Sequence, residues 1–81
     1  MKKIVKFEKR DCNPCVMVSN FLDTNGVDYQ KVNPFDEPHL AMKYKVRTVP
    51  TVILLDEEQE VYRTIGFQPN ELKELISFTN N

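Results

Sequence analysis

The feature that most constrains the fold is the apolar segment Thr51–Leu55, which directly follows Pro50. An unbroken apolar run of strand length is typical of a central strand whose two faces are both covered by other elements. In a chain of 81 residues, every covering element has to come from the same short sequence, and no second domain fits. We therefore expect one α/β domain over residues 1–81.

Apolar periodicity predicts the other elements around this strand. The expected strands cover residues 4–7, 27–33, 51–55 and 61–65, and the expected helices cover residues 13–25, 37–44 and a segment that opens at Pro69. The first two strands flank a helix and should be parallel, whereas the polar turn 56–59, which has no glycine, should make the last two antiparallel. In the second helix we expect Asp36 as the N-cap and Leu40 and Tyr44 as the buried pair.

The charge balance argues against two classes of partner. Eleven Lys and Arg against twelve Asp and Glu give a net charge of −1, so the chain has no general attraction to nucleic acid or to anionic lipid. The first ten residues are locally basic, with Lys2, Lys3, Lys6, Lys9 and Arg10. These cations form either an ordinary solvated face or a basic rim that docks an acidic partner.

The amino-terminal residues do not resemble an export signal. Only Ile4 and Val5 are apolar before Lys6, whereas a secretory signal needs roughly 7 to 15 apolar residues. No segment approaches the roughly 20 apolar residues that cross a bilayer. We expect a cytoplasmic protein with no membrane partner.

The cysteine pair Cys12-Asn13-Pro14-Cys15 falls between an expected strand and an expected helix. Cys12 should therefore stand at the helix start, where unpaired amides and the helix dipole stabilise a thiolate, with Cys15 one turn inside. Cys12 is the expected nucleophile, which forms a mixed disulfide with a partner, and Cys15 is the expected resolving residue. The charges of Lys9 and Arg10 should favour the thiolate and that of Asp11 should oppose it.

Two alternative roles for the cysteines are disfavoured. Half of a zinc site has the same spacing, but there is no second cysteine pair, and the one histidine, His39, is an expected helix residue to which we assign no role. A structural disulfide across so short a loop would restrict the unfolded chain little. Redox chemistry without a metal is the favoured interpretation.

A second candidate site is Thr48-Val49-Pro50-Thr51, immediately before the central strand. Proline cannot donate to the strand ladder, so Pro50 should stand at the first residue of the strand. The bond after Val49 is either cis or trans on these residues alone. If it is cis, the amide and carbonyl of Val49 face outward and can pair with an extended substrate segment.

With both sites placed, the chain resembles the thioredoxin superfamily in its minimal form. Lys9, Asp11 and the segment Cys12–Cys15 are similar to glutaredoxin-like redoxins, and Ala41–Thr51 is similar to thioredoxin itself. The segment Gly66–Leu72 is similar to the closing segment of small redoxins that donate electrons to ribonucleotide reductase.

The resemblance implies a thioredoxin fold with a four-stranded mixed sheet, flanked by three helices. Numbered along the chain, its strands lie in the order 2-1-3-4. It also implies that Pro50 is a cis-proline and that Gly66 leaves room for substrate. The implied catalytic residues are Cys12 and Cys15, and the implied substrate-binding residues are Asn13, Pro14, Val49, Pro50 and Gly66.

The chain departs from these families at several positions. Asp11 and Asn13 replace the Trp before the first cysteine and the Gly after it in the thioredoxin pattern, so a different substrate surface is expected. Lys6 stands where thioredoxin has a buried acid that shuttles protons, so proton transfer must involve Glu8, Lys9 or water. The segment Ile65–Gln68 lacks the double glycine and acid with which glutaredoxins hold glutathione.

The leading hypothesis is a small cytoplasmic dithiol–disulfide oxidoreductase that reduces protein disulfides. We expect a monomer with no bound cofactor beyond the Cys12–Cys15 disulfide. Its electrons would come ultimately from NADPH through thioredoxin reductase, and its clients would be disulfide-containing proteins, with ribonucleotide reductase as a candidate. The alternatives are a glutathione-coupled glutaredoxin and a non-enzymatic binding module of the same fold.

Overall fold

The computed structural model describes residues 1–79. Its elements in chain order are β1 (Lys2–Phe7), α1 (Asn13–Thr24), β2 (Gln30–Val32), α2 (Pro38–Lys43), β3 (Thr51–Asp56), β4 (Gln59–Ile65) and α3 (Pro69–Thr79). The strands form one sheet in the order β2-β1-β3-β4, in which β1 and β2 are parallel and the other pairs are antiparallel. The expected fold class, strand order and strand directions are confirmed.

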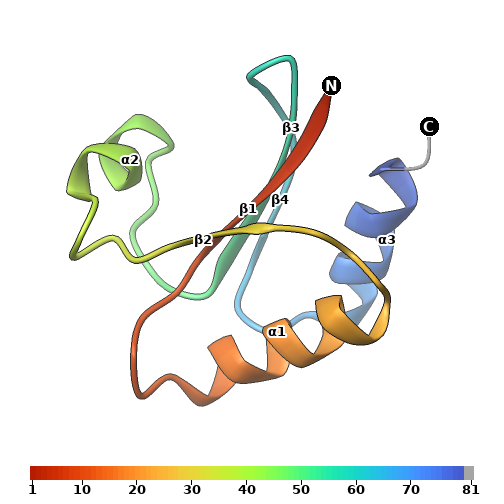
Figure 1. Cartoon of the computed structure of the whole chain (residues 1–81), viewed down its shortest axis with the longest axis horizontal. Helices are drawn as coiled ribbons and strands as arrows, with labels where there is room; N and C mark the ends of the chain where they lie inside the picture. Colours follow the sequence, from red (N-terminus) through yellow and green to blue (C-terminus); the bar gives the residue numbers. More distant parts are fainter. Residues whose placement is uncertain (80–81) are drawn as a thin grey trace.

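Helices cover the sheet on both faces, with α1 and α3 on one side and α2 on the other (Figure 1). The core consequently falls into two clusters, and β3 contributes alternate side chains to each. Val52 and Leu54 lie in the cluster under α1 and α3, whereas Ile53 and Leu55 lie in the cluster under α2. The segment expected to be covered on both faces is therefore buried on both.

The helix α2 contributes no fully buried side chain to the core. The start that the sequence predicted for this helix is wrong. The backbone carbonyl of Asn33 accepts the amides of Asp36 and Glu37 at 3.0 and 2.9 Å. Because this turn occupies Asp36, the N-cap is Glu37 and the helix begins at Pro38. Leu40 and Tyr44, the expected buried pair, are only half-buried, although both pack against the second cluster.

The strand β2 is shorter than the predicted segment 27–33. The amide of Val27 donates to the carbonyl of Leu22 at 3.0 Å, so the chain is still bonded to the end of α1 at that point. Val27 and Tyr29 pack against the cluster under α1. Only Gln30–Val32 joins the sheet.

The hairpin between β3 and β4 is tighter than expected. Glu57 and Glu58 form a two-residue turn with φ of 52° and 68°, and Asp56 pairs with Gln59 across it. Two-residue hairpins that match the twist of the strands need positive φ at both central residues. The turn adopts that conformation without glycine, and both strands extend beyond their predicted ends.

The registers bring the two candidate sites to the same end of the sheet. Phe7, the last residue of β1, pairs with Val32 and Thr51, and Thr51 pairs with Ile65. The segments 8–12, 33–37, 46–50 and 66–68 therefore all leave the sheet at this end. The β3–β4 turn and the amino terminus lie at the opposite end (Figure 1).

We expect Leu54→Ala to destabilise the protein by about 2–5 kcal/mol, because Leu54 is fully buried in the first cluster and its truncation leaves a cavity. Urea unfolding measures the change. Val61→Ala on the half-exposed face of β4 is the matched control and should change the free energy of unfolding by at most about 1 kcal/mol. A Leu54→Ala effect as small as that of the control would contradict the two-sided core.

Candidate active site

The cysteine pair lies at the start of α1. Cys12 is the N-cap residue in extended conformation, and its sulfur accepts a hydrogen bond from the amide of Cys15 at 3.2 Å. A disulfide joins the two residues, whose Cα atoms are 5.2 Å apart. Pro14 stands in the first turn, where a missing amide costs no helical hydrogen bond. The positive end of the helix therefore points directly at Cys12.

Exposure differs between the two cysteines and the residues that separate them. Cys12 is 8% exposed and Cys15 is 3% exposed, whereas Asn13 and Pro14 are exposed at the surface. Cys12 is thus the slightly more accessible of two buried cysteines, and Asn13 and Pro14 form the surface beside it.

The segment that contains Pro50 meets the sheet at the same end as the loop that leads to this helix start, because Phe7 pairs with Thr51. The Val49–Pro50 peptide bond is cis, which is the isomer that the family resemblance implied and one of the two that residues 48–51 alone left open. Within the described residues 1–79, the amide and carbonyl of Val49 take part in no backbone hydrogen bond. Both groups are therefore available to an extended segment of another chain.

Gly66 completes this end of the sheet. Its amide donates to the carbonyl of Pro50 at 2.8 Å, so the two residues are held together. Its φ of 78° is favourable for glycine, and a Cβ placed there would meet no atom within 4 Å. The space beside Pro50 at this position is therefore open.

A groove beside Val49 contains residues that the sequence did not single out. It has a volume of about 310 Å³ and is lined by Lys9, Pro34, Phe35, Val46, Arg47, Thr48 and Val49. Phe35 is 79% exposed there, and Lys9 and Arg47 supply two positive charges. Phe35 and Arg47 come from separate loops, and only the pairing of β1 with β2 and β3 brings those loops together.

An ordinary solvated face was one of the two expectations for the basic amino-terminal residues. The structure does not show one such face. Lys9 and Arg10 are exposed in the loop before Cys12, but Lys6 is only 1% exposed. The Lys6 ammonium donates to Glu8 Oε1 at 2.5 Å and to Ser19 Oγ of α1. Lysine is rarely buried unless it is paired, and here the carboxylate and the hydroxyl supply the partners.

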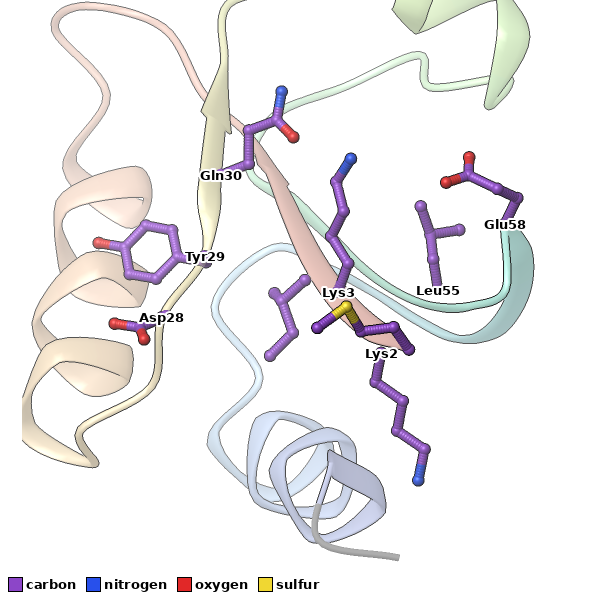
Figure 2. Close-up of a pocket in the computed structure, with 9 residues that line it drawn as sticks. Lys2, Lys3, Asp28, Tyr29, Gln30, Leu55 and Glu58 are labelled. Carbon is purple, nitrogen blue, oxygen red and sulfur yellow. The ribbon is translucent and has the colours of Figure 1, made fainter.

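A larger pocket lies away from the disulfide. It has a volume of about 520 Å³ and is formed where β1 begins, with Lys2, Lys3, Tyr29 and Glu58 among the residues that line it (Figure 2). Cys12 instead follows the other end of β1. The lining carries charges of both signs and no cysteine, so this pocket supplies nothing for disulfide exchange.

The described part of the chain has neither a cluster of metal ligands nor a helix of membrane-spanning length. Residues 1–79 contain no group of three or more His, Cys, Asp or Glu side chains arranged to hold a metal ion. His39 is exposed on α2. None of the helices described is long and apolar enough to cross a membrane.

The sequence matches the family model of thioredoxin over residues 1–79. It is 44% identical over 75 residues to the SPbeta prophage-derived thioredoxin-like protein YosR of Bacillus subtilis (strain 168). That alignment covers 91% of this chain and 94% of YosR. It is also 33% identical over 75 residues to a thioredoxin of Staphylococcus aureus. This second alignment covers 85% of this chain and 72% of that thioredoxin.

Solved structures show the same similarity. A thioredoxin of Fasciola hepatica aligns with a TM-score of 0.84 at 26% identity, over 95% of this chain and 79% of that one. A thioredoxin of Nicotiana alata aligns with a TM-score of 0.79 at 27% identity, over 95% of this chain and 71% of that one.

We expect Asp11→Asn to make Cys12 of the reduced protein react faster with iodoacetamide at pH 7, by about two- to threefold. Asp11 precedes Cys12 with a φ of 54°, a conformation that asparagine also tolerates, so the change removes a negative charge and leaves the backbone in place. Asp28→Asn, at the far end of the sheet, is the matched control and should have no effect. An unchanged or slower reaction of Asp11→Asn would show that this carboxylate does not oppose the thiolate.

Proposed function

The chain belongs to the thioredoxin family and is a thiol–disulfide oxidoreductase, and from this premise we propose that it reduces disulfides of client proteins through Cys12 and Cys15. The observation that carries the proposal is the hydrogen bond from the Cys15 amide to the Cys12 sulfur at the start of α1. In the reduced protein the same amide and the helix dipole stabilise a Cys12 thiolate. The thiolate is the form of cysteine that attacks a disulfide.

The proposed reaction has two exchange steps. The Cys12 thiolate attacks one sulfur of the client disulfide, forms a mixed disulfide and releases the other client sulfur as a thiolate. Cys15 then loses its proton and attacks Cys12, which re-forms the Cys12–Cys15 bond and releases the second client thiolate. Cys15 suits the second step because it is the less exposed sulfur and already lies within bonding distance of Cys12.

We assign client binding to the residues that surround Cys12 at this end of the sheet. The unpaired backbone groups of Val49 suit main-chain pairing with an extended client segment. Asn13 and Pro14 would contact the client from the helix side. Pro50 and Gly66 would border the space that the client enters.

Two further parts of the proposal concern the electron source and the client. We propose thioredoxin reductase as the donor that recharges the disulfide with electrons from NADPH, in line with the thioredoxin relatives. Ribonucleotide reductase is the candidate client, on the resemblance of Gly66–Leu72 alone. We place the reaction in the cytoplasm, because a reductant has to work where thiols are kept reduced.

The protein should support NADPH oxidation when it is mixed with a thioredoxin reductase and insulin, whose disulfides it would reduce. Absorbance of NADPH measures the rate, and Cys12→Ser, which lacks the nucleophile, should abolish it. Oxidation that occurs only with glutathione and glutathione reductase would instead support the glutaredoxin alternative. No oxidation with either electron source would reject both routes.

Gly66→Asn should lower kcat/KM for insulin reduction by about tenfold, because a side chain would enter the open space beside Pro50. Reduction of its own disulfide by dithiothreitol, a small reagent, should be unchanged. Gly26→Asn is the matched control, since Gly26 also has a positive φ and open space but lies at the end of α1. Equal activity of the two variants would contradict the role of Gly66.

A further inference from the structure

Lys6 forms a buried charged cluster beneath α1 that the two exchange steps leave without a role. Its ammonium is bonded to Glu8 Oε1, whose side chain is 28% exposed, and to Ser19 Oγ. Within the described residues, no fully buried side-chain N or O atom lacks a partner, so the cluster is complete as it stands. A buried ion pair is weak evidence for stability, because desolvation of the two charges offsets much of their attraction.

The cluster lies within about one helical turn of the resolving cysteine. Ser19 follows Cys15 by four residues on α1, a spacing that puts both side chains on one face of the helix about 6 Å apart along its axis. Lys6 touches Ser19 directly. The Lys6 ammonium is therefore one hydrogen bond away from a residue that lies one helical turn from Cys15, in a partly buried region where charges interact more strongly than at the open surface.

Other charged groups around Lys6 are farther away or already paired. The Tyr29 ring lies 5.9 Å from the Lys6 ammonium and 6.0 Å from that of Lys31 on β2. Figure 2 shows this ring directed toward α1, where its hydroxyl donates to Asp23 at 3.0 Å. The neighbouring part of β3 and the buried face of α3 contribute only apolar side chains, such as Val52 and Leu72. Lys6 and Glu8 are thus the opposed charges at Ser19, whereas Lys9, Arg10 and Asp11 are exposed in the loop before Cys12.

We propose that Lys6 is a positioning residue that controls the ionisation of Cys15 in the resolving step, by offsetting the negative charge of Glu8. This inference rests on the proposed function, since it assigns Cys15 as the resolving residue. With both charges present, the surroundings of Cys15 are close to neutral, and its thiol can lose a proton to solvent. Without Lys6, the Glu8 carboxylate would oppose the Cys15 thiolate, and without Glu8, the ammonium would favour it.

The resolving step can be isolated with an aryl disulfide such as Ellman's reagent. Cys12 attacks one sulfur of the reagent, forms a Cys12–aryl disulfide and releases one aryl thiolate. Cys15 then gives its proton to solvent and attacks Cys12, which forms the Cys12–Cys15 bond and releases the second aryl thiolate. The two cysteines lose two electrons and the reagent gains two. Stopped-flow absorbance separates the two releases, and the second reports Cys15.

Opposite shifts of the second phase are expected for two variants. Lys6→Met should shift the pH profile of the second phase to higher pH by roughly one unit. The second phase would then be about tenfold slower at neutral pH. Glu8→Gln should move the profile downward by a similar amount, and the double variant should return close to the parent. Ser19→Ala keeps both charges and is the matched control, with a shift below about 0.3 units.

The outcomes separate this inference from the proposed function. If no first phase occurs in the parent protein, Cys12 is not a nucleophile and the proposed function fails. If the first phase is normal, and Lys6→Met and Glu8→Gln leave the second-phase profile unchanged or shift it in the same direction, the role of Lys6 is overturned. Glu8 is partly exposed, so Glu8→Gln should fold and keeps the test decisive even if Lys6→Met does not fold.

Discussion

The hydrogen bond from the Cys15 amide to the Cys12 sulfur is the interaction on which the rest of the site depends. It places one sulfur at the positive end of α1 and keeps the other buried directly behind it. The fold serves this arrangement through its strand registers. Because Phe7 pairs with Thr51 and Thr51 pairs with Ile65, the cis-proline segment and Gly66 arrive at the same end of the sheet as the cysteines.

The features that could be predicted from the sequence are those that short segments determine by themselves. The apolar segment 51–55 predicted a strand buried on both faces, and the apolar periodicity after Cys15 predicted a helix over residues 13–25 with Cys12 at its start. The residues around Pro50 alone did not decide the isomer of the Val49–Pro50 bond, and only the family resemblance implied the cis form that the structure has. The predicted extent of β2 was wrong. The amide of Val27 donates a hydrogen bond to the carbonyl of Leu22 at the end of α1, and the apolar pattern of residues 27–33 gives no sign of this contact.

Contacts between distant segments account for what the sequence did not reveal about the site. In the sequence, Lys6 is one cation of a basic segment. Its burial is explained only by the packing of α1 over β1, which brings Ser19 to the Lys6 ammonium. Phe35 and Arg47 likewise gain meaning only when β2 and β3 bring their loops to the groove beside Val49.

The most direct measurement is the pH dependence of Cys12 alkylation by iodoacetamide in the fully reduced protein, with mass spectrometry to identify the labelled residue. A sulfur stabilised by the start of α1 should be labelled before Cys15. Its rate should follow a thiolate whose pKa lies clearly below the value of about 8.5 of an ordinary thiol. A Cys12 pKa at or above that value in the folded protein would contradict the stabilisation of a thiolate by the helix.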